Sequence, residues 1–155
     1  MTTEESIQAY FAEKVPQDWF TAPAAVDSDS EEILCVGVLP PETSVDEFRE
    51  RTRQARMAVA SEAEARFGRK VSWGVERDGV TMLFTTQSTP VMTRLRLRER
   101  KVLDTLIEAG VARSRSEALA WCVKLVERHQ GDWLAELREA LVGVAQVRTE
   151  GPTLL

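Results

Sequence analysis

Apolar residues recur with strand or helix periods along most of the chain, and the first half of that pattern predicts a mixed fold. Residues 33–39 form a compact apolar run that ends at two prolines, which is typical of a buried strand. Ser44–Glu47 reads as a capping box. It predicts the start of an amphipathic helix that runs to about Phe67 and is closed by Gly68.

Two further strands follow this helix. Residues 70–76 alternate Val71, Trp73 and Val75 on one face, and Arg77-Asp78-Gly79 has the composition of a hairpin turn. Residues 80–85 are predicted to form the second strand of this hairpin. The order strand, helix, strand, strand over residues 31–87 predicts a small α+β domain.

Residues 1–30 have a different character. Ile7, Tyr10, Phe11 and Val15 lie at helical spacing, so a short amphipathic helix is expected. Residues 21–30 are rich in alanine, proline, aspartate and serine, a composition typical of a linker. We therefore expect residues 1–30 to be a helical arm and a linker.

The C-terminal part begins with a stretch, Met92–Arg98, in which arginine and leucine alternate with period two, as in a strand. Helical spacing of apolar residues follows over 100–109 and ends at Gly110. A second capping box, Ser114–Glu117, opens a helix to about His129. Residues 91–129 thus form a predicted strand–helix–helix module, and residues 132–147 a last amphipathic helix.

Composition adds limits to this picture. The 155 residues, 43% of them hydrophobic, suffice for one sizeable core or two small ones. No apolar run approaches the length of a membrane helix, and no secretory signal is expected at the N-terminus. Cys35 and Cys122 lie far apart in apolar surroundings, so we expect two buried free thiols and a cytoplasmic location.

Charge is distributed unevenly along the chain. The net charge is −5, but residues 91–130 hold nine Lys/Arg against five Asp/Glu, which leaves +4 there and −9 elsewhere. An acidic body repels DNA, while a local basic face still attracts it.

The alternating stretch concentrates this basic charge. On a strand, Arg94, Arg96 and Arg98 share one face and Leu95 and Leu97 the other. A lone strand must pair, and pairing with its symmetry mate gives an isologous dimer. A two-stranded ribbon fits the major groove of B-DNA, and arginine suits guanine. The alternative is that these arginines form the solvated outer face of an ordinary strand.

The order of these elements resembles the ribbon-helix-helix family of DNA-binding proteins. The resemblance rests on Arg94–Arg98, Leu103-Asp104-Thr105-Leu106, Gly110 and Ser114–Ala118, about 40 residues in all. It implies that two chains pair their strands, that Arg94, Arg96 and Arg98 read bases, and that the second helix grips a phosphate. The expected phosphate contacts are Arg113, Ser114, Arg115 and Ser116. The expected dimer core is Leu95, Leu97, Leu103, Leu106, Leu119, Cys122 and Val123.

These features together predict a dimeric DNA-binding transcriptional regulator, repressor- or antitoxin-like. Its N-terminal domain would bind a partner protein or ligand, or build higher oligomers. The alternative is a homo-oligomerising interaction module without sequence-specific DNA binding. A third possibility is a small-molecule pocket between residues 33–39 and 71–84. No catalytic motif is found, and with His129 as the single histidine we expect no enzyme activity, metal or cofactor.

Overall fold

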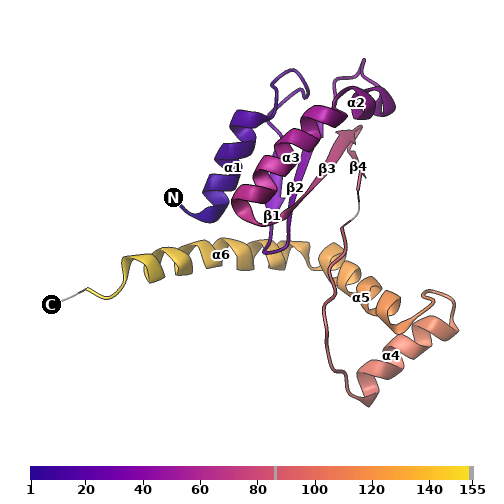
Figure 1. The fold of residues 1–155 in the computed structure, drawn as a ribbon. Coiled ribbons are helices and arrows are strands. Elements are labelled where there is room, and N and C mark those ends of the chain that lie inside the picture. Colours follow the sequence, from indigo (N-terminus) through magenta and orange to yellow (C-terminus); the bar gives the residue numbers. More distant parts are fainter. Residues whose placement is uncertain (86, 154–155) are drawn as a thin grey trace. The chain divides into compact units, whose positions relative to one another are not determined.

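A computed structural model of the chain describes residues 1–85 and 87–153 (Figure 1). The described chain divides into two compact units, Met1–Val91 (unit 1) and Met92–Leu155 (unit 2). It holds a four-stranded mixed sheet and six helices, which confirms the α+β class.

The sheet belongs to unit 1. Its strands are β1 (Ala25–Ser28), β2 (Glu32–Val38), β3 (Lys70–Arg77) and β4 (Val80–Leu83), in the order β1-β2-β3-β4. The central pair, β2 and β3, is parallel, and both outer pairs are antiparallel. The predicted hairpin joins β3 to β4 through Asp78 and Gly79, whose φ values of 52° and 76° suit a tight two-residue turn.

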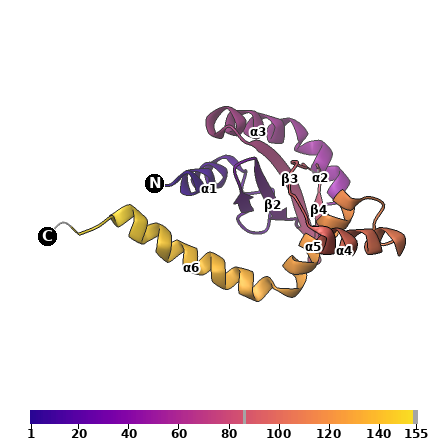
Figure 2. The same cartoon turned by 90° about the horizontal axis from the view of Figure 1, so that it is seen from below.

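Three helices cover one face of this sheet, namely α1 (Thr3–Lys14), α2 (Val45–Arg51) and α3 (Arg53–Phe67) (Figures 1 and 2). Alternate residues of β2 point toward them, since Ile33 and Cys35 are fully buried while their neighbours are half-exposed. Ile7 and Phe11 of α1 and Phe48 of α2 complete an aromatic-rich core with them. Unit 1 therefore has a continuous core of its own.

Two expectations for unit 1 are wrong. Residues 1–30 are no arm and linker: α1 buries Ile7, Tyr10 and Phe11 in the core, and Ala25–Ser28 pairs with β2 as an edge strand. The helix expected over 45–67 is interrupted at Thr52. The hydroxyl of Thr52 donates to the Phe48 carbonyl at 2.6 Å, a back-bond that often bends a helix.

Among the described residues of unit 2, the regular elements are three helices: α4 (Leu97–Glu108), α5 (Arg115–His129) and α6 (Gly131–Glu150). Its core is small and consists of Leu103, Ala112 and Ala118, with partly buried neighbours. Cys122 is half-buried here and Cys35 is buried in unit 1, and both thiols are free. Over the described residues, no helix has the length and apolar character needed to cross a bilayer.

Candidate functional site

The candidate site is the helical hairpin of α4 and α5 in unit 2. Gly110 ends α4 with a φ of 80°, a conformation that favours glycine. The N–H of Val111 then donates back to the Leu106 carbonyl at 2.9 Å and turns the chain toward α5. Leu103 from α4 and Ala118 from α5 meet in the small core, so the hairpin fixes the start of α5 beside α4.

The arginine-rich segment is not a strand. Residues 91–96 have no regular secondary structure, and α4 begins at Leu97, three residues earlier than predicted. The carboxylate of Glu99 accepts from the Arg96 N–H at 2.5 Å and caps the helix there. Arg98 therefore lies on α4, and the face shared by three alternate arginines is absent from the described chain. This part of the expected fold is wrong.

The arginines predicted to read bases are nevertheless all accessible. Arg94, Arg96 and Arg98 are exposed. None of the three takes part in an ion pair among the described residues. Arg100 behaves differently, because its guanidinium donates to the Leu95 carbonyl at 2.6 Å and holds the segment against the start of α4. This contact fixes Leu95, which packs on the small core.

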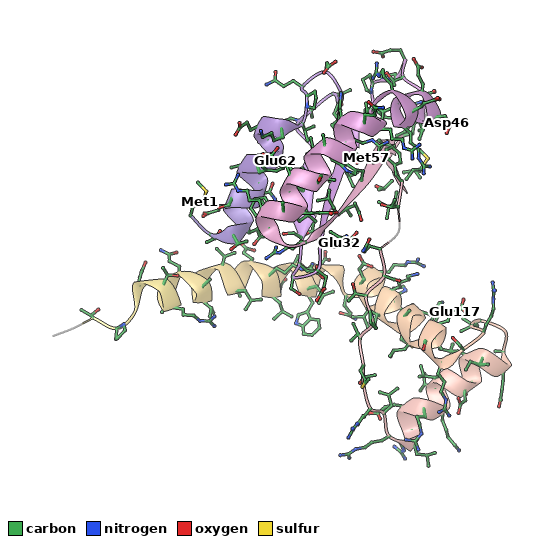
Figure 3. The ribbon with its side chains drawn as sticks, viewed as in Figure 1. Met1, Glu32, Asp46, Met57, Glu62 and Glu117 are labelled. Carbon is green, nitrogen blue, oxygen red and sulfur yellow. The ribbon has the colours of Figure 1, made fainter. Side chains whose placement is uncertain are left out.

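The start of α5 is capped as predicted. The Ser114 hydroxyl accepts from the Glu117 N–H at 3.1 Å, and the Glu117 carboxylate accepts from the Arg113 N–H at 2.8 Å. Glu117, labelled in Figure 3, thus places a negative charge in the first turn of α5. A carboxylate at this position already interacts with the positive end of the helix dipole.

Arg115 is engaged by an acidic partner that sequence spacing does not reveal. Its guanidinium donates to both carboxylate oxygens of Asp104, at 2.9 and 3.0 Å. These hydrogen bonds lower the pKa of the Asp104 carboxyl and raise the pKa of Arg115. Of the four predicted phosphate contacts, Ser114 and Arg115 therefore already have protein partners, while Arg113 and Ser116 present exposed side chains.

The predicted dimer-core residues are only partly brought together. Leu103 is buried, and Leu95, Leu106, Leu119 and Cys122 pack against it. Two others point elsewhere, since Leu97 is 60% exposed and Val123 is 63% exposed. Within one chain, unit 2 therefore assembles five of the seven predicted residues.

Residues 132–147 do form part of an amphipathic last helix, but its apolar positions are left uncovered in the structure. None of the 20 residues of α6 is buried. Even its large apolar residues are open to solvent, since Trp133 is 55% exposed and Leu141 is 61% exposed. Trp121 and Val126 on α5 are exposed as well. Exposed apolar residues thus recur along both α5 and α6. The apolar positions of α6 could already be recognised from the amphipathic pattern of its sequence.

The described residues offer no group of His, Cys, Asp and Glu side chains that could hold a metal ion. The chemistry of the hairpin is therefore that of accessible guanidinium groups beside an unpartnered apolar face. It can bind anions and associate with other helices.

Comparison with known proteins gives two family models that together match most of the chain. The Rv1265-like protein N-terminal domain matches residues 5–83, and the Mb1296 C-terminal domain matches residues 96–148. The chain is 52% identical over 157 aligned residues to protein Rv1265 of Mycobacterium tuberculosis and to protein Mb1296 of Mycobacterium bovis, both described as uncharacterized. The alignment covers 94% of this chain and 70% of each relative. No solved structure matches.

These matches correct the assignment to the ribbon-helix-helix family. The family model on residues 96–148 is the Mb1296 C-terminal domain, and no ribbon-helix-helix model was found. The matched region also includes α6, which lies outside the predicted strand–helix–helix module. A short alternating stretch and a capped helical hairpin are thus insufficient to identify that family.

Proposed function

We propose that this chain, which belongs to the Rv1265-like protein family, is a homodimeric DNA-binding regulator. In this proposal unit 2 supplies both the dimer contact and the surface for the DNA backbone. The role implies a cytoplasmic location. The observation that carries it is the segregation of charge: exposed arginines gather at the start of unit 2, in a region of net charge +4 within a chain of net charge −5.

The proposed DNA contact is electrostatic. Arg94, Arg96 and Arg98 are exposed and unpaired among the described residues, so no protein carboxylate has to be displaced before they meet phosphates. Arg113 lies beside the start of α5 and adds a further exposed guanidinium. Each such contact releases counterions from DNA, which favours binding at low salt. Contacts of this kind position a protein on the duplex without specifying sequence.

The dimer is proposed from the exposed apolar residues of α5 and α6. A second copy offers the same surface, and an isologous contact would cover both at once. The dimer also doubles the number of arginines presented to one duplex. This matters because the acidic unit 1 repels DNA.

Binding to a fluorescent random-sequence duplex tests the DNA contact. We expect affinity to fall steeply as salt is raised, and the double variant Arg94→Ala/Arg96→Ala to bind more weakly and to reduce the log–log salt slope by about two. The matched control is Arg138→Ala/Arg148→Ala, which removes the same charge from α6 and should change binding less. Equal binding by both variants and the wild type contradicts the proposal.

A second candidate function has its own supporting observation. Because α6 buries none of its residues, unit 2 is suited to serve only as a homo-oligomerising interaction module. The titration with the random-sequence duplex distinguishes the two functions. A protein that is dimeric in solution but ignores duplex DNA at low salt favours the interaction module.

A further inference from the structure

Unit 1 contains a cleft whose arginines are not among the predicted site residues and have no part in the proposed function. It has a volume of about 720 Å³ and lies where α2 and α3 meet the edge of the sheet near β4. Asp46 on α2 and Met57 on α3, both labelled in Figure 3, are among its lining residues. Its cationic side chains are Arg49, Arg53 and Arg56.

The three arginines have no acidic partner. None of the ion pairs among the described residues includes them. Arg56 is the most unusual, because its residue surface is only 8% exposed. Its Nε donates to the Thr52 hydroxyl at 3.0 Å and one Nη donates to the Arg49 carbonyl at 2.7 Å. Burial and the neighbouring Arg49 and Arg53 lower the pKa of Arg56, so the cluster is electrostatically unfavourable when empty.

Local structure holds these charges together despite their repulsion. The interruption at Thr52 places the end of α2 and the start of α3 side by side in sequence, so arginines from both helices reach one cleft. Arg49 and Arg56 also stack on the Phe84 ring, at 5.3 and 4.7 Å from its centroid. Cation–π contacts of this kind orient guanidinium groups without neutralising them. A negative ligand would therefore be stabilised.

Several further lining residues are apolar. Met57, Ala60, Val71, Trp73 and Phe84 provide aliphatic and aromatic surface beside the arginines. A bare inorganic ion would leave this surface in water. A ligand that combines a negative group with a flat apolar body would use both parts, as is usual for small-molecule sites.

The net charge of the lining residues indicates which kind of anionic group the cleft would bind. Asp46 and Glu50 also line the cleft, so three positive charges face two negative ones and the net charge is +1. This balance matches a monoanion better than a polyanion. A carboxylate is planar and accepts two parallel hydrogen bonds from one guanidinium, which a lysine cluster would not offer.

We propose that this cleft binds a small monocarboxylate with a flat apolar body, held by Arg49, Arg53 and Arg56 and packed against Phe84. Arg53 is exposed and its guanidinium donates no hydrogen bond among the described residues, so it is the arginine best placed to close over the carboxylate. The site lies wholly within unit 1 and is independent of dimerisation and of DNA contact by unit 2.

Calorimetric titration of the full chain with naphthoate tests this site, with naphthamide as a neutral ligand of the same shape. We expect naphthoate to bind, and Arg53→Gln to weaken its affinity by about tenfold or more, as the loss of a charge-assisted hydrogen bond implies. Arg51→Gln is the matched control, because Arg51 lies on α2 but does not line the cleft. It should bind like the wild type.

Three results would overturn the proposal. Naphthoate and naphthamide that bind equally would show that the arginines do not recognise charge. Inorganic phosphate that binds while naphthoate does not would show that the apolar lining is irrelevant. Equal losses in Arg53→Gln and Arg51→Gln would show a general effect of charge on the protein surface. Circular dichroism of each variant verifies that unit 1 remains folded.

Discussion

Unit 1 and unit 2 differ in how much of their apolar surface one chain can bury. In unit 1, helices α1–α3 pack on a sheet, and residues such as Phe11, Phe48 and Val75 are almost completely enclosed. Among the described residues of unit 2, Leu103, Ala112 and Ala118 alone are buried. The difference is not one of composition, because α5 and α6 are rich in tryptophan, leucine and valine. It is one of architecture.

A layer of helices on a sheet encloses a core, whereas two short helices followed by a third with no buried residue do not. Unit 1 is therefore expected to fold as an independent body. In the proposed function, a second copy of the chain covers the exposed residues of α5 and α6. Variants in either unit test this difference in burial.

The largest effect is expected in the core of unit 1. Phe48→Ala removes a ring that packs against Trp19, with centroids 5.7 Å apart, and leaves a cavity. We expect a loss of about 3–5 kcal/mol in the free energy of unfolding of unit 1. Urea titration followed by tryptophan emission, with Trp121 and Trp133 replaced by phenylalanine, reports on unit 1 alone. Val80→Ala, at an exposed position of β4, should be nearly neutral; a similar loss there would contradict a compact core around Phe48.

The next effect is expected on assembly rather than on folding. Leu137→Asp/Leu141→Asp places two charges on the exposed face of α6, where burial by a second copy would then be costly. We expect the dimer dissociation constant to rise at least about a hundredfold, while the unfolding midpoint of unit 1 stays unchanged. Light scattering over a dilution series measures this. Glu139→Gln on the same helix is the control, and an unchanged dissociation constant in the double variant would exclude α6 from the contact.

A smaller effect distinguishes the two cysteines. Burial raises the pKa of the Cys35 thiol to about 12 from its ordinary value of 9.0. The raised folded pKa means that the stability it contributes is complete below about pH 9 and is lost as pH rises toward the folded pKa. Between pH 9 and 10 we expect unit 1 to lose about 1 kcal/mol more than its Cys35→Ala variant does.

Urea unfolding of both proteins at the two pH values provides the measurement. Cys122→Ala is the matched control in unit 2, where the thiol is only half-buried. It should leave the pH dependence of unit 1 unchanged. Identical pH dependence in wild type and Cys35→Ala would contradict the burial of this thiol.

The smallest effect is expected at the exposed ion pair of unit 2. Arg115 lowers the pKa of Asp104, so the pair stabilises above the unfolded pKa of Asp104 and this contribution is lost as pH falls through the lower folded value. Asp104→Asn should slightly destabilise unit 2 at neutral pH and low salt, and not in acid or high salt. Asp132→Asn is the control for general charge effects. A deficit of Asp104→Asn that persists in acid would argue against the ion pair as its cause.

The sequence predicted those elements whose side chains face one core. The alternation of Val71, Trp73 and Val75 identified β3, and the Asp78-Gly79 turn identified the hairpin to β4. It missed β1 because Ala25–Ser28 is an edge strand of only four residues of mixed polarity, and its pairing with β2 is not encoded locally. It also wrongly predicted a strand over Met92–Arg98, because the cap from Glu99, which starts α4 at Leu97, lies outside the alternating run.

The sequence likewise predicted only part of the candidate site. The cap at Ser114 follows from local spacing and is confirmed. The pairing of Arg115 with Asp104 was missed, since these residues are brought together only when the turn at Gly110 folds α5 back on α4. The cluster of Arg49, Arg53 and Arg56 was missed, although residues 49–56 hold four arginines against one glutamate. Only the meeting of α2 and α3 at one cleft reveals it.

The central claim is that unit 2 is completed by a second copy of the chain. Sedimentation equilibrium of the full chain at micromolar concentration measures this most directly. The account predicts a molar mass twice the chain mass of 17.4 kDa, returning toward 17.4 kDa on dilution. A mass of 17.4 kDa at every concentration would contradict it.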